Sequence, residues 1–210
     1  MKGDAVKKGI LGFGILILFA NDSYAVYGTK TEFYYGAGLS LPAGPDTFKT
    51  FWDKGINLGG GIGYSFLSRI ALIAYFDYTS FPLDKKAVIQ EFDLNITESE
   101  VEGESAKILH LSGNLKLSPF LNPKTFSPFV SGGIGILKYS SEVVRTPGTG
   151  TAERIGERSS TGFSTNLGAG LDILIPGPLD IFLEGRYIIG FTEGESTSYI
   201  PLRGGLKAGF

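Results

Sequence analysis

The chain has 210 residues, no cysteine and a formal net charge of −2. Without cysteine, a small exported fold held by disulfides is excluded, and the slightly acidic balance argues against a nucleic-acid partner, because binding phosphates requires a basic surface. Glycine is unusually frequent, at 31 residues, and it occurs inside alternating segments, which is typical of strands and not of linkers.

The first 25 residues have the pattern of a secretory signal peptide. Lys2, Lys7 and Lys8 precede the apolar run GILGFGILILFA, and SYA fits a cleavage site with small residues. The run is too short for a spanning helix, which needs about 20 apolar residues, so cleavage is favoured over retention as an anchor. The mature protein would comprise residues 26–210, one domain with 16 basic and 19 acidic residues after three lysines and two aspartates are removed.

Beyond residue 26, apolar and polar residues alternate repeatedly, and no stretch has a sustained helical period. This alternation predicts eight strands, and in the first of them Phe33, Tyr35 and Leu39 share one face while Glu32 and Ser40 share the other. The predicted strands span residues 31–41, 55–66, 69–81, 106–117, 128–140, 161–175, 179–191 and 198–210.

The connections between these strands alternate in length. Those after the second, fourth and sixth strands are short, whereas longer polar segments follow the first, third and fifth. The pattern predicts an all-β fold, a closed eight-stranded antiparallel up-and-down transmembrane β-barrel with short periplasmic turns and longer extracellular loops. The predicted loops are residues 42–54, 82–105, 141–160 and 192–196.

Alternation alone does not decide which face points inward, so a soluble ligand-binding barrel is the alternative. In a soluble barrel, the face opposite the apolar one would meet water and should carry many charged residues. In the second strand this face carries only asparagine, serine and glycine. Turned inward, the glycines leave room for charged side chains, which must be paired when buried. The predicted interior residues are Glu32, Arg69, Asp77, His110, Lys116, Asp172, Asp180, Glu184, Arg186, Arg203 and Lys207.

The last predicted strand ends on an aromatic residue, with Leu202 and Leu206 on the same face as Phe210. This pattern resembles the terminal strand that barrel-assembly machinery recognises in bacterial outer-membrane proteins. Aromatics near the other strand ends, among them Tyr35, Tyr64 and Tyr187, suit interface girdles. We expect deletion of Phe210 to reduce assembly in the outer membrane.

Several motifs carry a family resemblance across residues 26–210: FYYGAGLSLP, GINLGGGIGYSF, SPFVSGGIGILKY and the ending LRGGLKAGF. Together they resemble the eight-stranded outer-membrane barrels of the OmpA-like and opacity types. The resemblance implies a location in the outer membrane, contact with its lipid and lipopolysaccharide, and assembly by the barrel-assembly machinery. It also implies a role as an anchor, an adhesin or another surface protein, and we expect a monomer.

His110 and Ser112 are the one candidate catalytic pair. They resemble the His-x-Ser pair of PagL-like lipid A deacylases, in which histidine activates serine. Here Gly113 precedes Asn114 where that motif continues with asparagine, the predicted register turns His110 inward, and no third carboxylate can be assigned. A hydrogen-bonded interior histidine is therefore favoured, and we expect no catalytic residues and no cofactor.

Asp93–Glu104 matches part of the spacing of an EF-hand calcium loop, but Glu98 stands where the turn needs glycine, and no flanking helices are predicted. A solvated acidic loop without a metal is favoured. The loop at 82–105, with seven acids against two lysines, suggests a polar or cationic partner and argues against heparin-like polyanions. Phe51 and Trp52 in the first loop are predicted to be interface residues or, less favoured, a binding anchor.

Taken together, the sequence predicts a membrane scaffold that presents surface loops for structural or adhesive interaction, including an extracellular or host ligand. A narrow channel for ions or small apolar solutes is the main alternative, and a lipid A deacylase is the third.

Overall fold

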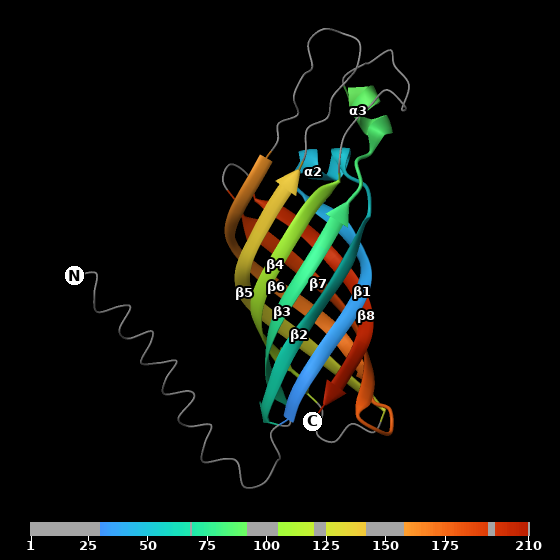
Figure 1. Ribbon diagram of the computed structural model, residues 1–210, viewed down its shortest axis with the longest axis vertical. Helices are drawn as coiled ribbons and strands as arrows, with labels where there is room; N and C mark the ends of the chain where they lie inside the picture. The colour runs from blue at the N-terminus through green and yellow to red at the C-terminus, as the bar shows by residue number, and fades with distance from the viewer. Residues whose placement is uncertain are drawn as a thin grey trace, which may run out of the picture.

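The computed structural model describes residues 30–67, 69–91, 105–119, 125–141, 158–192 and 196–209. These form one closed barrel of eight strands, each hydrogen-bonded to its neighbours in chain order, with β1 (blue) beside β8 (red) in Figure 1. The strands are β1 (Lys30–Gly44), β2 (Gly55–Leu67), β3 (Ile70–Phe81), β4 (Ala106–Leu117), β5 (Phe126–Ser141), β6 (Arg158–Ile173), β7 (Leu179–Phe191) and β8 (Thr197–Gly209).

The predicted fold class is confirmed, and β4 and β7 have the predicted bounds. All pairs are antiparallel, and the closing pair sets Leu39 opposite Leu202. β6 begins three residues earlier than predicted, because Arg158 to Ser160 continue the ladder with β5 beyond the clearly alternating segment. Hydrogen bonding between strands does not require the apolar pattern, so it extends farther than that pattern does.

The two ends of the barrel differ. The ends of β2, β4 and β6 and the starts of β3, β5 and β7 lie at the lower end in Figure 1, called here the turn end, and the two short helices described lie at the opposite, loop end. The helices are α2 (Asp46–Phe51) and α3 (Lys85–Glu91). Both lie in segments predicted as loops, and at six and seven residues they are too short for a periodic signal. None of the helices described is long and apolar enough to cross a membrane.

The outer surface is apolar on every strand. Exposed fractions reach 70% for Leu167 and 66% for Ile56, values that in a water-soluble barrel would leave large hydrophobic side chains in water. In β5, Val130, Ile134 and Ile136 point outward, as predicted for this strand. Tyr35, which was predicted to belong to an interface girdle, is also exposed.

Glycines on the inward face make room for large side chains opposite them. A Cβ added at Gly168 would lie 2.6 Å from Cγ of Arg186, and one at Gly61 would lie 2.6 Å from the Tyr75 ring. At Gly59 the added carbon would overlap the Asp77 carboxylate. The glycines therefore accommodate interior aromatic residues as well as the predicted charges.

Candidate functional site

Four charged residues fill the middle of the barrel: Asp77, Glu184, Arg186 and Arg203. We call this set the central ionic cluster. Arg186 and Arg203 both donate to the Asp77 carboxylate, and Arg203 also donates to Glu184 Oε2 from Nε (2.9 Å) and Nη2 (2.7 Å). Ser131 Oγ donates to the other Glu184 oxygen at 3.3 Å. All four charged side chains are at most 1% exposed, so their opposite charges offset each other inside the barrel.

Aromatic rings support the two guanidinium groups. The guanidinium carbons of Arg203 and Arg186 lie 4.4 and 4.8 Å from the centre of the Tyr75 ring, within the range of cation–π contacts. The guanidinium carbon of Arg203 also lies 5.7 Å from the centre of the Phe182 ring. Both rings are buried on the inward face, so the central layer is aromatic and ionic together.

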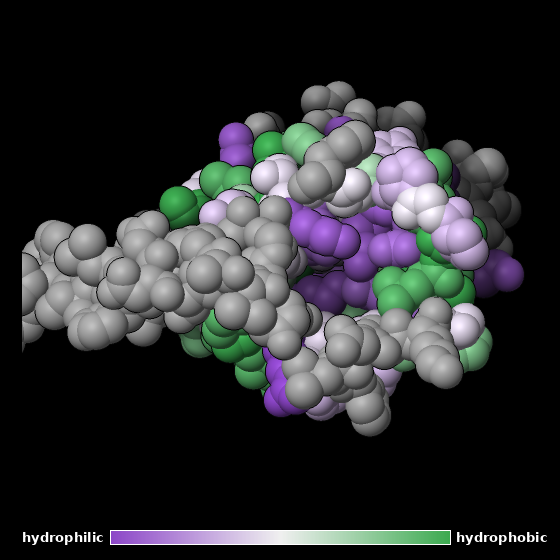
Figure 2. Space-filling model, turned by 90° about the horizontal axis from the view of Figure 1, so that it is seen from below, coloured by the Kyte–Doolittle hydropathy of each residue, from purple (hydrophilic) through white to green (hydrophobic). Residues whose placement is uncertain are grey.

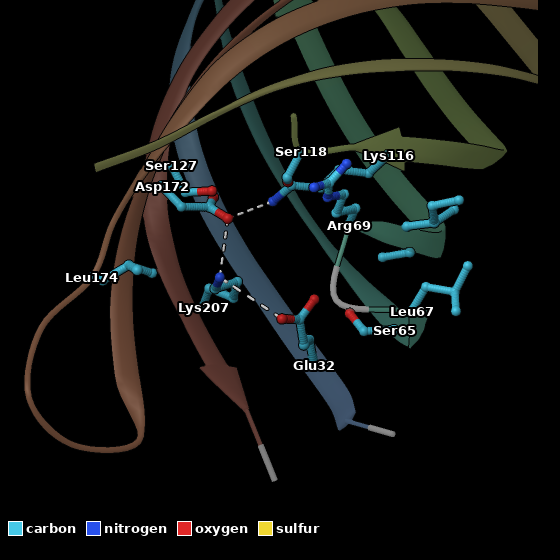
Figure 3. A pocket seen from close by; sticks show the side chains of 12 residues that line it. Glu32, Ser65, Leu67, Arg69, Lys116, Ser118, Ser127, Asp172, Leu174 and Lys207 are labelled. Atoms are coloured by element: carbon cyan, nitrogen blue, oxygen red, sulfur yellow. Dashed lines mark hydrogen bonds and ion pairs between the residues drawn. The ribbon is translucent and has the colours of Figure 1, made fainter. Parts of the chain in front are cut away.

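A second ionic cluster lies nearer the turn end. Asp172 accepts hydrogen bonds from Lys116 at 2.7 Å and from Lys207 at 3.0 Å (Figure 3). Lys207 also lies 3.1 Å from Asp180 and 3.7 Å from Glu32. Here the barrel opens into a cavity of about 150 Å³. Figure 2, which looks onto this end, shows hydrophilic residues filling the opening and hydrophobic ones around it.

The predicted interior charges face into the barrel, with the exception of Arg69. Arg69 is exposed and precedes β3 at the turn end, where its side chain lines the rim of the cavity (Figure 3). The physical reason is that β3 begins at Ile70, so the inward alternation of this strand does not extend to residue 69. Its backbone carbonyl accepts a hydrogen bond from the Ser118 amide at 2.8 Å.

His110 is fully buried and interacts with a different serine from the one predicted. Its Nε2 lies 3.0 Å from Ser164 Oγ on β6, and its Nδ1 lies 3.9 Å from Asp77 Oδ2. Ser112 instead accepts a hydrogen bond from Asn114. The histidine thus lies inside the barrel between Asp77 and Ser164, away from the lipid-facing surface on which a lipid A ester would have to bind.

An apolar cluster closes the loop end of the interior. It contains Phe48 and Trp52 from the first connection and residues from five strands: Phe81, Ala106, Ile108, Leu137, Tyr139, Ile188 and Tyr199. The Phe48 ring lies 5.0 Å from that of Phe81 and 6.0 Å from that of Tyr139, both edge to face. We call this set the loop-end cluster.

The predicted position of Trp52 was wrong. Trp52 is 9% exposed, inside the loop-end cluster, and neither a girdle residue nor an exposed anchor. Phe51 is half-buried and packs against both this cluster and Val88 of α3. The spacing of Phe48, Phe51 and Trp52 (i, i+3, i+4) is the one sequence signal that could have revealed a helix with an inward apolar side.

Other predictions lie partly or wholly outside the described residues. These are the signal peptide, the segment Asp93–Glu104 and Phe210. Leu202 and Leu206, the other two residues of the predicted assembly signal, lie on the outward face, and each is about half exposed. Within the described part of the chain, no three residues of the His, Cys, Asp or Glu type are grouped so that they could hold a metal ion.

A closed barrel with an apolar outer face and an ion-paired interior defines a transmembrane β-barrel protein. Residues 12–204 match the model of the outer membrane protein β-barrel domain, and the chain belongs to this family. It is therefore a bacterial outer-membrane protein that crosses the membrane with eight strands, and the turn end corresponds to the periplasmic side.

Solved structures show the same fold. Neisserial surface protein A is 13% identical and superposes with a TM-score of 0.59, covering 88% of this chain and 100% of that one. OprG from Pseudomonas aeruginosa is also 13% identical, with a TM-score of 0.51 and coverage of 87% and 96%. No curated protein matches this chain significantly.

Proposed function

We propose that this protein is a closed, non-conducting and non-catalytic membrane scaffold that presents its loop-end segments for interaction at the cell surface. The observation that carries the proposal is the filling of the barrel. The central ionic cluster occupies the middle, and the loop-end cluster seals the extracellular end with side chains from α2.

A conducting barrel would need a continuous wet path, and two features oppose one. Around the centre, Arg186 is held by Asp77 of β3, and Arg203 is held by Asp77 and by Glu184 of β7, so moving either arginine would leave a buried charge unpaired. Toward the loop end, the buried apolar side chains of the loop-end cluster disfavour water and ions, and the buried polar residues Asn57 and Thr79 at this end hydrogen-bond each other.

The loop end offers the surface for recognition, since binding residues concentrate on connections held by a rigid scaffold. Residues 82–105 hold two lysines and seven acids: Asp84, Glu91, Asp93, Glu98, Glu100, Glu102 and Glu104. The partner surface we propose is therefore polar or cationic.

The first arm of the test is conductance of the mature chain refolded into a planar bilayer. We expect no discrete openings from protein whose folding is shown by its shifted gel migration when unheated. Reproducible openings from the folded protein would assign it to transport instead.

The second arm tests the loops in the same refolded protein, held in nanodiscs. We expect poly-L-lysine to bind in a salt-sensitive manner and heparin not to bind, and a variant with the seven acids changed to their amides to lose the binding. Equal binding by both forms would contradict the proposed role of the acidic loop.

A further inference from the structure

A second hollow lies on the outside of the barrel at the turn end. Its volume is about 560 Å³, and it is lined by Arg69, Ile70, Leu117, Ser118, Pro119, Pro128, Phe129 and Val130. The size falls within the range of about 300–1,000 Å³ that is usual for small-molecule sites. We call it the turn-end groove.

The groove runs across three neighbouring strands. The register sets Ile70 of β3 opposite Leu117 of β4, and Leu117 opposite Val130 of β5. Leu117 and Val130 are 40% and 51% exposed on the outward face, so this wall of the groove faces membrane lipid. Its apolar surface suits a hydrocarbon chain.

Among the residues that the structure describes, Arg69 is the one charged residue that lines the groove, and it also lines the polar cavity at the barrel opening. Within the described residues, its guanidinium group forms no ion pair, whereas Lys116 and Lys207 beside it are held by Asp172. The Arg69 guanidinium therefore lies where an apolar hollow and a polar one meet.

We propose that the turn-end groove and Arg69 bind one glycerophospholipid of the periplasmic leaflet. An acyl chain would lie along Ile70, Leu117 and Val130, and the phosphate would accept hydrogen bonds from the Arg69 guanidinium. A planar guanidinium donates to two phosphate oxygens at once, which favours phosphate over a neutral headgroup. Lipopolysaccharide is not the occupant, because it fills the outer leaflet at the opposite end of the barrel.

The test is native mass spectrometry of the folded mature chain, titrated in detergent with phosphatidylglycerol. We expect one bound lipid at low concentration, and binding about tenfold weaker for Arg69→Gln, as for the loss of one charge-assisted contact. Val130→Trp, which fills the groove, should weaken binding similarly. Lys30→Gln, another exposed cation at the turn end, and Leu183→Trp, an outward position on β7, are the matched controls and should bind as the wild type does.

Diacylglycerol and lipid A serve as comparison ligands. We expect diacylglycerol to bind the wild type more weakly than phosphatidylglycerol and to be insensitive to Arg69→Gln. Equal phosphatidylglycerol binding by all variants would mean that the lipid is only part of the general annulus, and would overturn the proposal. Tighter binding of lipid A, or saturation by inorganic phosphate alone, would also overturn it. If Val130→Trp fails to fold, Arg69→Gln decides the outcome. The Arg69 side chain is exposed, so replacing it should not prevent folding.

Discussion

At the scale of single residues, Asp77 is the carboxylate that joins the two arginines of the central ionic cluster. Its two carboxylate oxygens each accept from a different arginine, Arg186 from β7 and Arg203 from β8, while Asp77 itself belongs to β3. One side chain thus ties together strands on different sides of the barrel. In so small an interior, such a contact replaces the apolar core of a soluble domain.

We therefore predict that Asp77→Asn lowers the free energy of unfolding in lipid vesicles by about 3–5 kcal/mol, because two buried guanidinium groups then share only Glu184. Urea titration followed by tryptophan fluorescence measures the change. The control is Asp46→Asn in α2. There the exposed Lys49 ammonium hydrogen-bonds the carboxylate and lowers its pKa, and replacing the residue should leave the unfolding midpoint unchanged. A similar small effect at both sites would contradict a structural role for Asp77.

At the scale of elements, α2 places an aromatic side chain inside the loop end of the barrel. It has six residues and one buried side chain, Phe48, and the bridge between Trp52 and Leu83 anchors its end to the next connection. A helix this short is not stable alone, so its order comes from packing on the loop-end cluster.

Phe48→Ala tests this dependence. Removing a buried aromatic ring costs about 3–5 kcal/mol, and we expect that loss locally, as faster amide hydrogen exchange in residues 46–52 while the strands stay protected. Thr47→Ala, at the neighbouring exposed position of α2, should leave the exchange unchanged. Unchanged exchange in Phe48→Ala would mean that α2 is held by something other than this ring.

At the scale of the whole molecule, the free-energy cost of a charge on the outward face depends on how deep in the membrane that position lies. Ile62 lies near the middle of β2 and is 57% exposed, and Ile56 lies one residue from the loop-end start of the same strand at 66% exposure. Both side chains point outward, but they differ in depth.

We predict that Ile62→Arg lowers the free energy of unfolding by about 2–4 kcal/mol and Ile56→Arg by only about 0–1 kcal/mol, following the depth dependence of charges on the lipid face. Urea unfolding of both variants in the same vesicles gives the comparison, with Ile56→Arg as the matched control. Equal costs would show that β2 does not cross the membrane at this depth.

The sequence by itself determined the strands, their order and the face that meets lipid. Period-two alternation, as in Leu109, Leu111 and Leu115 of β4, is imposed by hydrocarbon on one side of every strand, so each strand carries the signal locally. The charges on the opposite face followed from the same pattern, and so did the need for them to pair.

The tertiary structure alone decided how the interior is layered. Ile108, Leu137 and Ile188 occupy inward positions that alternation predicts as polar, and they form the loop-end cluster because distant strands bring them to the same height. Trp52 belongs to the same cluster because it follows a helix that is too short to leave a periodic pattern in the sequence. Arg69 lies at the rim of the cavity because β3 begins one residue later than predicted. Alternation reports which face a side chain occupies, whereas its partners across the barrel depend on register and closure, which no local pattern encodes.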